Sequence, residues 1–207
     1  MMIEENIATL NIPTEEKIMR AATRVFTRRG YDGTTTRDIA EVAGINVATL
    51  HYYHRKKEDL FRQVAETSMR EFVQIHTEIF SHPLPLREKI YAFVDRYTEM
   101  FEHRPHLALF CVLESERTPE SFHELVDFHA PHRVLTKQLE GLYASGEIRK
   151  ISPQQFLNAL VGMTIYPFIT KGTILTVNEM DEAGFSQMLQ AHKRMVPEMI
   201  INYVFVK

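Results

Sequence analysis

Residues 34–53 read TTTRDIAEVAGINVATLHYY and predict two short helices joined by a tight turn at Gly44. Thr36 is expected to cap the first of these helices, and Asn46 is expected to cap the second. The inward face of the first helix is expected to consist of Ile39, Ala40 and Ala43. This layout is that of a helix-turn-helix, whose second helix can enter the major groove of DNA.

A longer amphipathic helix is predicted before this unit, over residues 14–29. Its apolar residues recur at the spacing of one helical face and are Ile18, Ala21, Ala22, Val25 and Phe26. Thr14 is the expected N-cap, and Gly30 is expected to end the helix in a left-handed conformation. Residues 1–13 show no clear period, so we expect them to form a loose arm.

The rest of the chain predicts six further helices and no sheet. They are expected over residues 57–80, 86–103, 105–115, 119–144, 153–171 and 182–205. The predicted fold class is therefore all-α with nine helices. Residues 1–56 are expected to form the arm and a three-helix DNA-binding domain, and residues 57–207 a helical bundle for ligand binding and dimerisation.

Length and composition are those of an ordinary globular protein, with 207 residues, 44% of them hydrophobic and 25% charged. No run of about 18 apolar residues occurs, so no transmembrane helix is expected. Glu4 and Glu5 stand where a signal peptide would be basic. Together with the single cysteine, Cys111, these features predict a cytoplasmic protein with no membrane partner.

The charge is spread unevenly over the chain. The whole sequence carries a net charge of −3, but residues 14–60 hold nine Lys and Arg against seven Asp and Glu. DNA binding depends on this local balance rather than on the total. Arg55, Lys56 and Lys57 follow the predicted recognition helix directly and supply a modest basic cluster.

The segment from residue 14 to residue 61 resembles the TetR/AcrR family of one-component transcriptional regulators. The resemblance rests on Phe26, Gly30-Tyr31, Thr35-Thr36, Asp38-Ile39-Ala40, Ala43-Gly44, Thr49-Leu50 and Lys57-Glu58-Asp59-Leu60. In the C-terminal part it is limited to an outline of short motifs. The resemblance implies a homodimer that binds double-stranded DNA at a palindromic operator and also binds a small-molecule effector.

Nine residues are predicted to contact DNA. Thr36, at a helix N-terminus, can bond a phosphate oxygen. The first turn of the recognition helix reaches base edges, where Thr49 can offer a methyl or a hydroxyl group. Lys57 is expected to contact a phosphate by its charge. The full predicted set is Thr36, Asn46, Val47, Ala48, Thr49, His51, Tyr52, Tyr53 and Lys57.

The end of the recognition helix departs from the family pattern. His51 stands where tyrosine is usual, Tyr53 where histidine is usual, and His54 where phenylalanine is usual. Because that phenylalanine packs under the recognition helix, His54 is expected to be either buried and neutral or rotated outward. Lys56 replaces the usual Ser or Thr cap, so the next helix is expected to fray at its start.

Aromatic and methionine residues between positions 86 and 170 predict either an ordinary core or an apolar cavity with a few polar groups such as Arg96. The resemblance implies the cavity, for an apolar or aromatic effector. Its predicted lining is Phe93, Tyr97, Met100, Phe110, His123, Met163 and Tyr166.

The last predicted helix carries a continuous apolar stripe that is wide for an exposed helix. Together with the helix at 153–171 it can form a four-helix interface across a two-fold axis. The predicted interface residues are Phe156, Leu160, Met188, His192, Met195, Met199, Ile200 and Tyr203. Such a dimer would present two recognition helices to a palindrome.

No catalytic motif and no fixed zinc-ligand spacing occurs among the ten histidines and the acidic residues. We therefore predict no enzyme activity, cofactor or metal. The predicted function is that of a ligand-responsive regulator, a repressor released from its operator by a small molecule. The alternative is a helical small-molecule or metal sensor with weak or lost specific DNA binding. The departures from the family pattern at His51, Tyr53 and His54 support this alternative.

Overall fold

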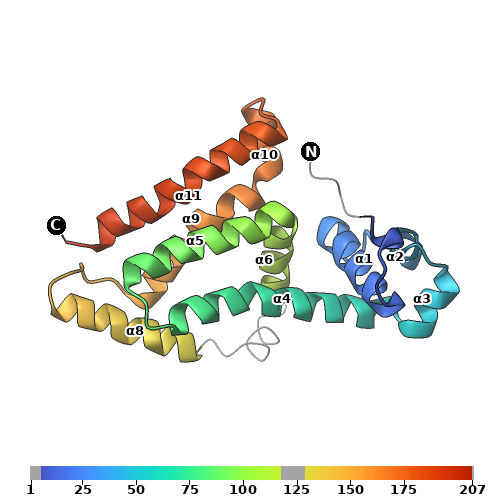
Figure 1. Cartoon of the computed structure of the whole chain (residues 1–207), viewed down its shortest axis with the longest axis horizontal. Helices are drawn as coiled ribbons and strands as arrows, with labels where there is room; N and C mark the ends of the chain where they lie inside the picture. Colours follow the sequence, from blue (N-terminus) through green and yellow to red (C-terminus); the bar gives the residue numbers. More distant parts are fainter. Residues whose placement is uncertain (1–5, 118–128, 207) are drawn as a thin grey trace.

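Figure 1 shows the computed structural model of the chain, which describes residues 6–117 and 129–206. Within these residues the regular elements are all helical, which confirms the all-α prediction; one isolated β-bridge joins Ile148 to Phe205. The helices are η1 (Ile7–Thr9), α1 (Thr14–Arg29), α2 (Thr36–Ala43), α3 (Val47–Tyr53), α4 (Lys57–Ser81), α5 (Leu86–His103), α6 (Leu107–Arg117), α8 (His129–Ala144), α9 (Pro153–Ile169), α10 (Lys171–Val177) and α11 (Glu182–Val204).

The first turn of α2 begins one residue earlier than predicted. Thr35, not Thr36, is the N-cap: its Oγ1 accepts from the backbone N–H of Asp38 at 3.2 Å, and Oδ2 of Asp38 accepts from the N–H of Thr35 at 2.7 Å. This reciprocal pair is a capping box, which needs an acidic or amide side chain three residues after the cap. Asp38 therefore selects Thr35 from the run of three threonines.

The turn between α2 and α3 has the predicted conformation. Gly44 adopts left-handed backbone angles (φ 68°, ψ 34°), and Oδ1 of Asn46 accepts from the N–H of Thr49 at 2.7 Å. Glycine takes this conformation without the steric cost of a Cβ atom. Gly44 as the end of α2 and Asn46 as the cap of α3 are thus both confirmed.

The described part of the N-terminal arm is packed rather than loose, so that prediction was wrong. Ile7 is buried in the hydrophobic core, and η1 contacts both α1 and α2. Lys17 Nζ donates to the carbonyl oxygen of Ala8 at 3.0 Å. A three-residue helix is too short to show a period, so the sequence pattern could not reveal it.

The long helix α4 joins the N-terminal head, α1 to α3, to the body, α5 to α11 (Figure 1). Lys56, its N-cap, makes no side-chain capping bond. The ring of Phe61 on α4 packs against three other aromatic rings. Its centre lies 5.0 Å from the ring centre of Phe26, 5.1 Å from that of Tyr31 and 6.0 Å from that of Phe110 on α6. The head and the body therefore share one hydrophobic core, and α6 also contacts α1 directly.

One helix of the body differs from its prediction. The sequence predicted a single helix over 153–171, whereas the chain breaks at Thr170, bends by 61° and continues as α10. Pro167, buried within α9, lacks the N–H of a regular helix, and the break follows three residues later. The predicted helix start at Pro119 lies outside the described residues.

Within the described ranges, no single helix is both long and apolar enough to cross a lipid bilayer. Helices α9 and α10 meet those criteria only as a bent pair.

Candidate functional site

The outward face of α3 holds the most exposed part of the predicted DNA surface. Tyr52 is 82% exposed, and its ring meets the ring of Tyr53 edge to face at 5.4 Å. Ala48 and His51 are also exposed, while Leu50 is buried and anchors the opposite face of α3 in the core. A short helix with one anchored face and one free face can be laid into a DNA groove.

The first turn of α3 carries polar groups that can read bases. Oδ1 of Asn46 accepts from both the N–H and the hydroxyl of Thr49, the latter at 3.0 Å. The Asn46 side chain is exposed, and no bond among the described residues engages its Nδ2 donor. Val47 and Thr49 are half-buried beside it, and Thr36 is half-buried in the first turn of α2.

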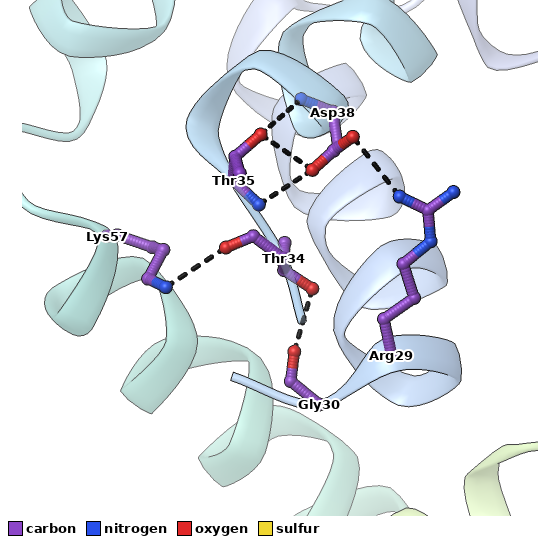
Figure 2. Close-up of polar contacts among 6 residues, drawn as sticks. All are labelled: Arg29, Gly30, Thr34, Thr35, Asp38 and Lys57. Carbon is purple, nitrogen blue, oxygen red and sulfur yellow. Dashed lines mark hydrogen bonds and ion pairs between the residues drawn. The ribbon is translucent and has the colours of Figure 1, made fainter. Parts of the chain in front are cut away.

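Lys57, predicted to contact a phosphate, makes three contacts within the chain. Its Nζ donates to the carbonyl oxygens of Tyr31 at 2.9 Å and of Thr34 at 3.0 Å, and it lies 3.9 Å from the centre of the Tyr31 ring. Thr34 is buried, and its hydroxyl donates to the carbonyl of Gly30 at 2.7 Å (Figure 2). Lys57 thus fastens the start of α4 to the loop before α2, and its phosphate contact stays a prediction.

An ion pair holds α1 to α2 beside this loop. Arg29 Nη1 lies 3.1 Å from Oδ1 of Asp38, as Figure 2 shows. Hydrogen bonds from the Thr35 side chain and backbone, together with the Arg29 guanidinium, keep the pKa of Asp38 below its ordinary value. The carboxylate therefore stays charged and keeps the capping box closed at neutral pH.

His54 ends α3 with its ring turned into the protein. Its Nε2 atom is buried and has no hydrogen-bond partner within residues 6–117 and 129–206. Burial lowers the pKa of His54 below its ordinary value, so the ring is neutral at pH 7. Of the two expectations for this residue, the structure matches the buried and neutral one.

Four members of the predicted effector lining pack in or against the hydrophobic core. Phe93 and Tyr97 are buried with ring centres 4.3 Å apart, and the Tyr97 hydroxyl donates to the carbonyl of Phe72 at 2.5 Å. Phe110 packs on Phe61, and Met163 is half-buried on α9.

Two further members of that predicted set stand apart from the core. Tyr166 is 64% exposed on α9, so its side chain does not line the interior as predicted. His123 lies outside the described residues.

A groove of about 470 Å³ instead lies between α4 and α5. Its lining residues are Glu71, Gln74, Ile75, Glu78, Arg96, Glu99, Met100, His103 and Arg104. Ion pairs span it, from Arg96 to Glu78 at 2.7 Å and from Arg104 to Glu71. Met100 is the member of the predicted effector set that lines it, and Arg96 had been a further polar candidate.

Sequence reasoning missed most of this groove because polar helical residues usually face solvent. One signal was present: the α4 wall is formed by positions 71, 74, 75 and 78, the i, i+3, i+4, i+7 spacing of a single helical face. A face that meets a neighbouring helix is normally apolar.

The predicted dimer residues separate into two groups. Phe156, Leu160 and Ile200 are buried in the core of their own chain, so they cannot reach a partner in this conformation, and the prediction is corrected there. Met188 and His192 are half-buried. Exposed large side chains remain on α11 and on neighbouring α9, and these are Met195, Met199, Tyr203 and Tyr166.

Residues 18–64 match the family model of bacterial regulatory proteins, tetR family. The chain is 29% identical over 109 residues to the HTH-type transcriptional regulator YhgD of Bacillus subtilis, covering 53% of this chain and 49% of YhgD. It is 27% identical over 119 residues to IcaR of Staphylococcus epidermidis, a negative regulator of the biofilm operon icaADBC, covering 56% and 60%. These matches span only about half to three fifths of the length of the two curated relatives.

The whole fold is shared with solved structures. A TetR transcriptional regulator from Chloroflexus aurantiacus aligns with a TM-score of 0.65 at 18% identity, covering 94% of this chain and 97% of that one. FadR of Bacillus subtilis, solved in complex with stearoyl-CoA, aligns with a TM-score of 0.61 at 19% identity, covering 90% and 97%. The helix-turn-helix segment, residues 18–64, therefore matches the tetR family of bacterial regulatory proteins, and the chain as a whole shares the fold of a solved TetR transcriptional regulator.

Proposed function

We propose that this protein is a DNA-binding transcriptional regulator that binds a palindromic operator as a homodimer. The observation that carries the proposal is α3, which is capped by Asn46, anchored by Leu50 and exposed along the face of Ala48, His51 and Tyr52. Such a helix enters the major groove with its N-terminal residues against base edges. The relatives named as transcriptional regulators, one of them a negative regulator, support repression.

The exposed stripe on α11 supports the homodimer. Met195, Met199 and Tyr203 follow one another at four-residue intervals, so they lie on one helical face, and Tyr166 adds a further exposed apolar ring on α9. The opposite face of α11 is buried in the chain's own core. A helix with apolar residues on two opposite faces is usually buried on both, here by its own core on one side and by the proposed partner on the other.

The groove between α4 and α5 is the effector site that we propose. The sequence predicted an apolar or aromatic effector, whereas the groove offers charged walls around Ile75 and Met100 and so favours a ligand with both polar and apolar parts. Arg104 lies between α5 and α6, and Phe110 on α6 reaches the head through Phe61. A ligand that displaces Arg104 from Glu71 would move α6 and change the separation of the two heads.

Release from the operator requires a difference in affinity. The effector must bind the DNA-incompetent arrangement more tightly than the DNA-bound one, because a ligand with equal affinity for both shifts nothing. In the proposed switch, the closed arrangement is the observed one, with Arg96 and Arg104 paired to α4, and the ligand would break these pairs to form the open one.

Selection of genomic DNA fragments by the purified protein at physiological salt tests the proposal. We expect enrichment of one palindrome, and Tyr52→Ala should weaken binding to it without loss of fold. Tyr91→Ala on α5 is the matched control, because it removes an exposed tyrosine far along the chain from α3. Uniform binding that salt abolishes would instead favour the alternative, a small-molecule sensor without operator specificity.

A further inference from the structure

The N-terminal arm packs closely against the turn of the helix-turn-helix, where Ala8 meets Gly44. A Cβ atom placed on Gly44 would lie 2.4 Å from the Cβ of Ala8, far inside normal contact distance. Gly44 thus serves two purposes: its left-handed backbone ends α2, and its missing side chain admits the arm. Figure 1 shows this first segment lying against α1 and α2.

Two further contacts hold the arm in that place, and two hydrogen bonds within the arm close its short helix. Ile7 is only 3% exposed and belongs to the hydrophobic core. Lys17 on α1 donates to the carbonyl of Ala8 at 3.0 Å. Oδ1 of Asn6 accepts from the N–H of Ala8 at 3.2 Å, and the N–H of Leu10 donates to the carbonyl of Ile7 at 3.2 Å, so the short helix is closed at both ends.

The turn that the arm contacts sets the direction of the recognition helix. Only Ile45 and Asn46 separate Gly44 from the first residue of α3. Helix α3 has seven residues, of which Leu50 is the buried one. With so small an anchor, its orientation depends strongly on the turn, and a fixed turn avoids the entropy cost of ordering α3 on DNA.

We infer that Ile7 and Ala8 are positioning residues for operator recognition: the arm locks the Gly44 turn and so holds α3 at the angle that fits the DNA groove. This inference rests on the proposed DNA-binding function. It assigns no DNA contact to either residue, because both act through Gly44.

A double-mutant cycle in the full chain tests the contact, with operator affinity as the readout. Gly44→Ala is measured once beside Ala8 and once in an Ala8→Gly background. The backbone strain of an alanine at φ 68° is common to both backgrounds, so the cycle isolates the clash with Ala8. We expect Gly44→Ala to cost about tenfold more affinity beside Ala8 than beside glycine.

A second pair of variants separates positioning from folding. Ile7→Ala should lower the ratio of specific to non-specific DNA affinity, and Ile7→Val should restore most of it. The salt dependence of binding should not change, because Ile7 carries no charge. Asn11→Ala, at an exposed arm position, is the control and should bind like the parent. Circular dichroism confirms that each variant is folded.

The inference is overturned if Gly44→Ala costs the same affinity in both backgrounds, or if Ile7→Ala leaves the specificity ratio unchanged. Failure of the proposed function looks different, since the unmodified protein would then select no operator.

Discussion

His192 on α11 donates a hydrogen bond from Nε2 to the carbonyl oxygen of Met163 on α9, at 2.7 Å. Met163 lies four residues before Pro167, so its carbonyl is the one that the proline leaves without a helical N–H partner. The imidazole supplies the missing donor from a neighbouring helix. His192 was predicted to contact a second chain; this bond gives it a role within its own.

Replacing His192 by Leu should therefore destabilise the protein. The carbonyl of Met163 would lose its donor, at a cost of about 1–2 kcal/mol in the free energy of unfolding. His192→Gln keeps an N–H donor and should lose less. Urea denaturation measures both, with Gln190→Leu at an exposed position of α11 as the control. Equal stability of His192→Leu and the parent would contradict this assignment.

Met199 and Ile200 are adjacent in the chain but differ in environment, at 51% and 5% exposure. Met199→Glu should therefore give a folded monomer in sedimentation velocity, because the charge enters only the proposed interface. Ile200→Glu should instead destabilise the fold by about 3 kcal/mol or more, since an unpaired charge would be buried. A dimer that survives Met199→Glu would place the interface elsewhere.

Lys57→Gln distinguishes a role of Lys57 in intramolecular hydrogen bonding from a role in phosphate contact. Loss of the bonds to Tyr31 and Thr34 should lower the free energy of unfolding by about 1–2 kcal/mol and leave the salt dependence of operator binding unchanged. A phosphate contact predicts the reverse, a salt slope reduced by about one with stability unchanged. Lys56→Gln is the neighbouring exposed control.

Burial, with a smaller contribution from His132 on α8, lowers the pKa of His76 to about 4. The unfolded chain takes up this proton near pH 6.5, so between pH 6.5 and 4 it binds more protons than the folded protein. The contribution of His76 to the free energy of unfolding is therefore greatest above pH 6.5 and is about 2 kcal/mol smaller at pH 5. Urea titrations at pH 7.5 and 5 should show that loss.

His76→Gln should remove most of this pH dependence, whatever its effect on absolute stability. The exposed His82, changed to Gln, is the matched control and should retain it. An unchanged pH dependence in His76→Gln would assign the effect to other groups.

Cys111 should be unreactive in the folded protein. Burial raises the pKa of its thiol to about 12, and Sγ donates to the carbonyl of Ser68 at 3.9 Å. The thiolate is the reactive form, so a disulfide reagent should modify Cys111 only after denaturation. Rapid modification without denaturant would show that α6 opens readily.

Local signals in the sequence were sufficient for the helix-turn-helix. Gly44 and Asn46 act on the backbone within four residues of themselves, so their roles could be predicted without the rest of the fold. The cap of α2 was missed by one position, because three threonines in a row each satisfy the simple rule and only Asp38 separates them.

Long-range relations could not be predicted in the same way. Met199 and Ile200 are both apolar, and periodicity does not tell which face of α11 meets its own core. The arm lacked a period, and the polar groove resembled ordinary solvated surface. Each of these depends on which helices become neighbours, which no short window of sequence contains.

The ring contacts from Tyr31 through Phe61 to Phe110 limit how freely the two halves of such a regulator can be exchanged. A chimaera that joins a foreign head to this body would keep the Phe61–Phe110 contact but lose Phe26 and Tyr31, the head rings that pack against Phe61. Its new head must therefore present aromatic side chains of similar volume at positions 26 and 31. The head and the body of this chain are joined by a shared hydrophobic core rather than by a linker, so neither can be exchanged independently of the other.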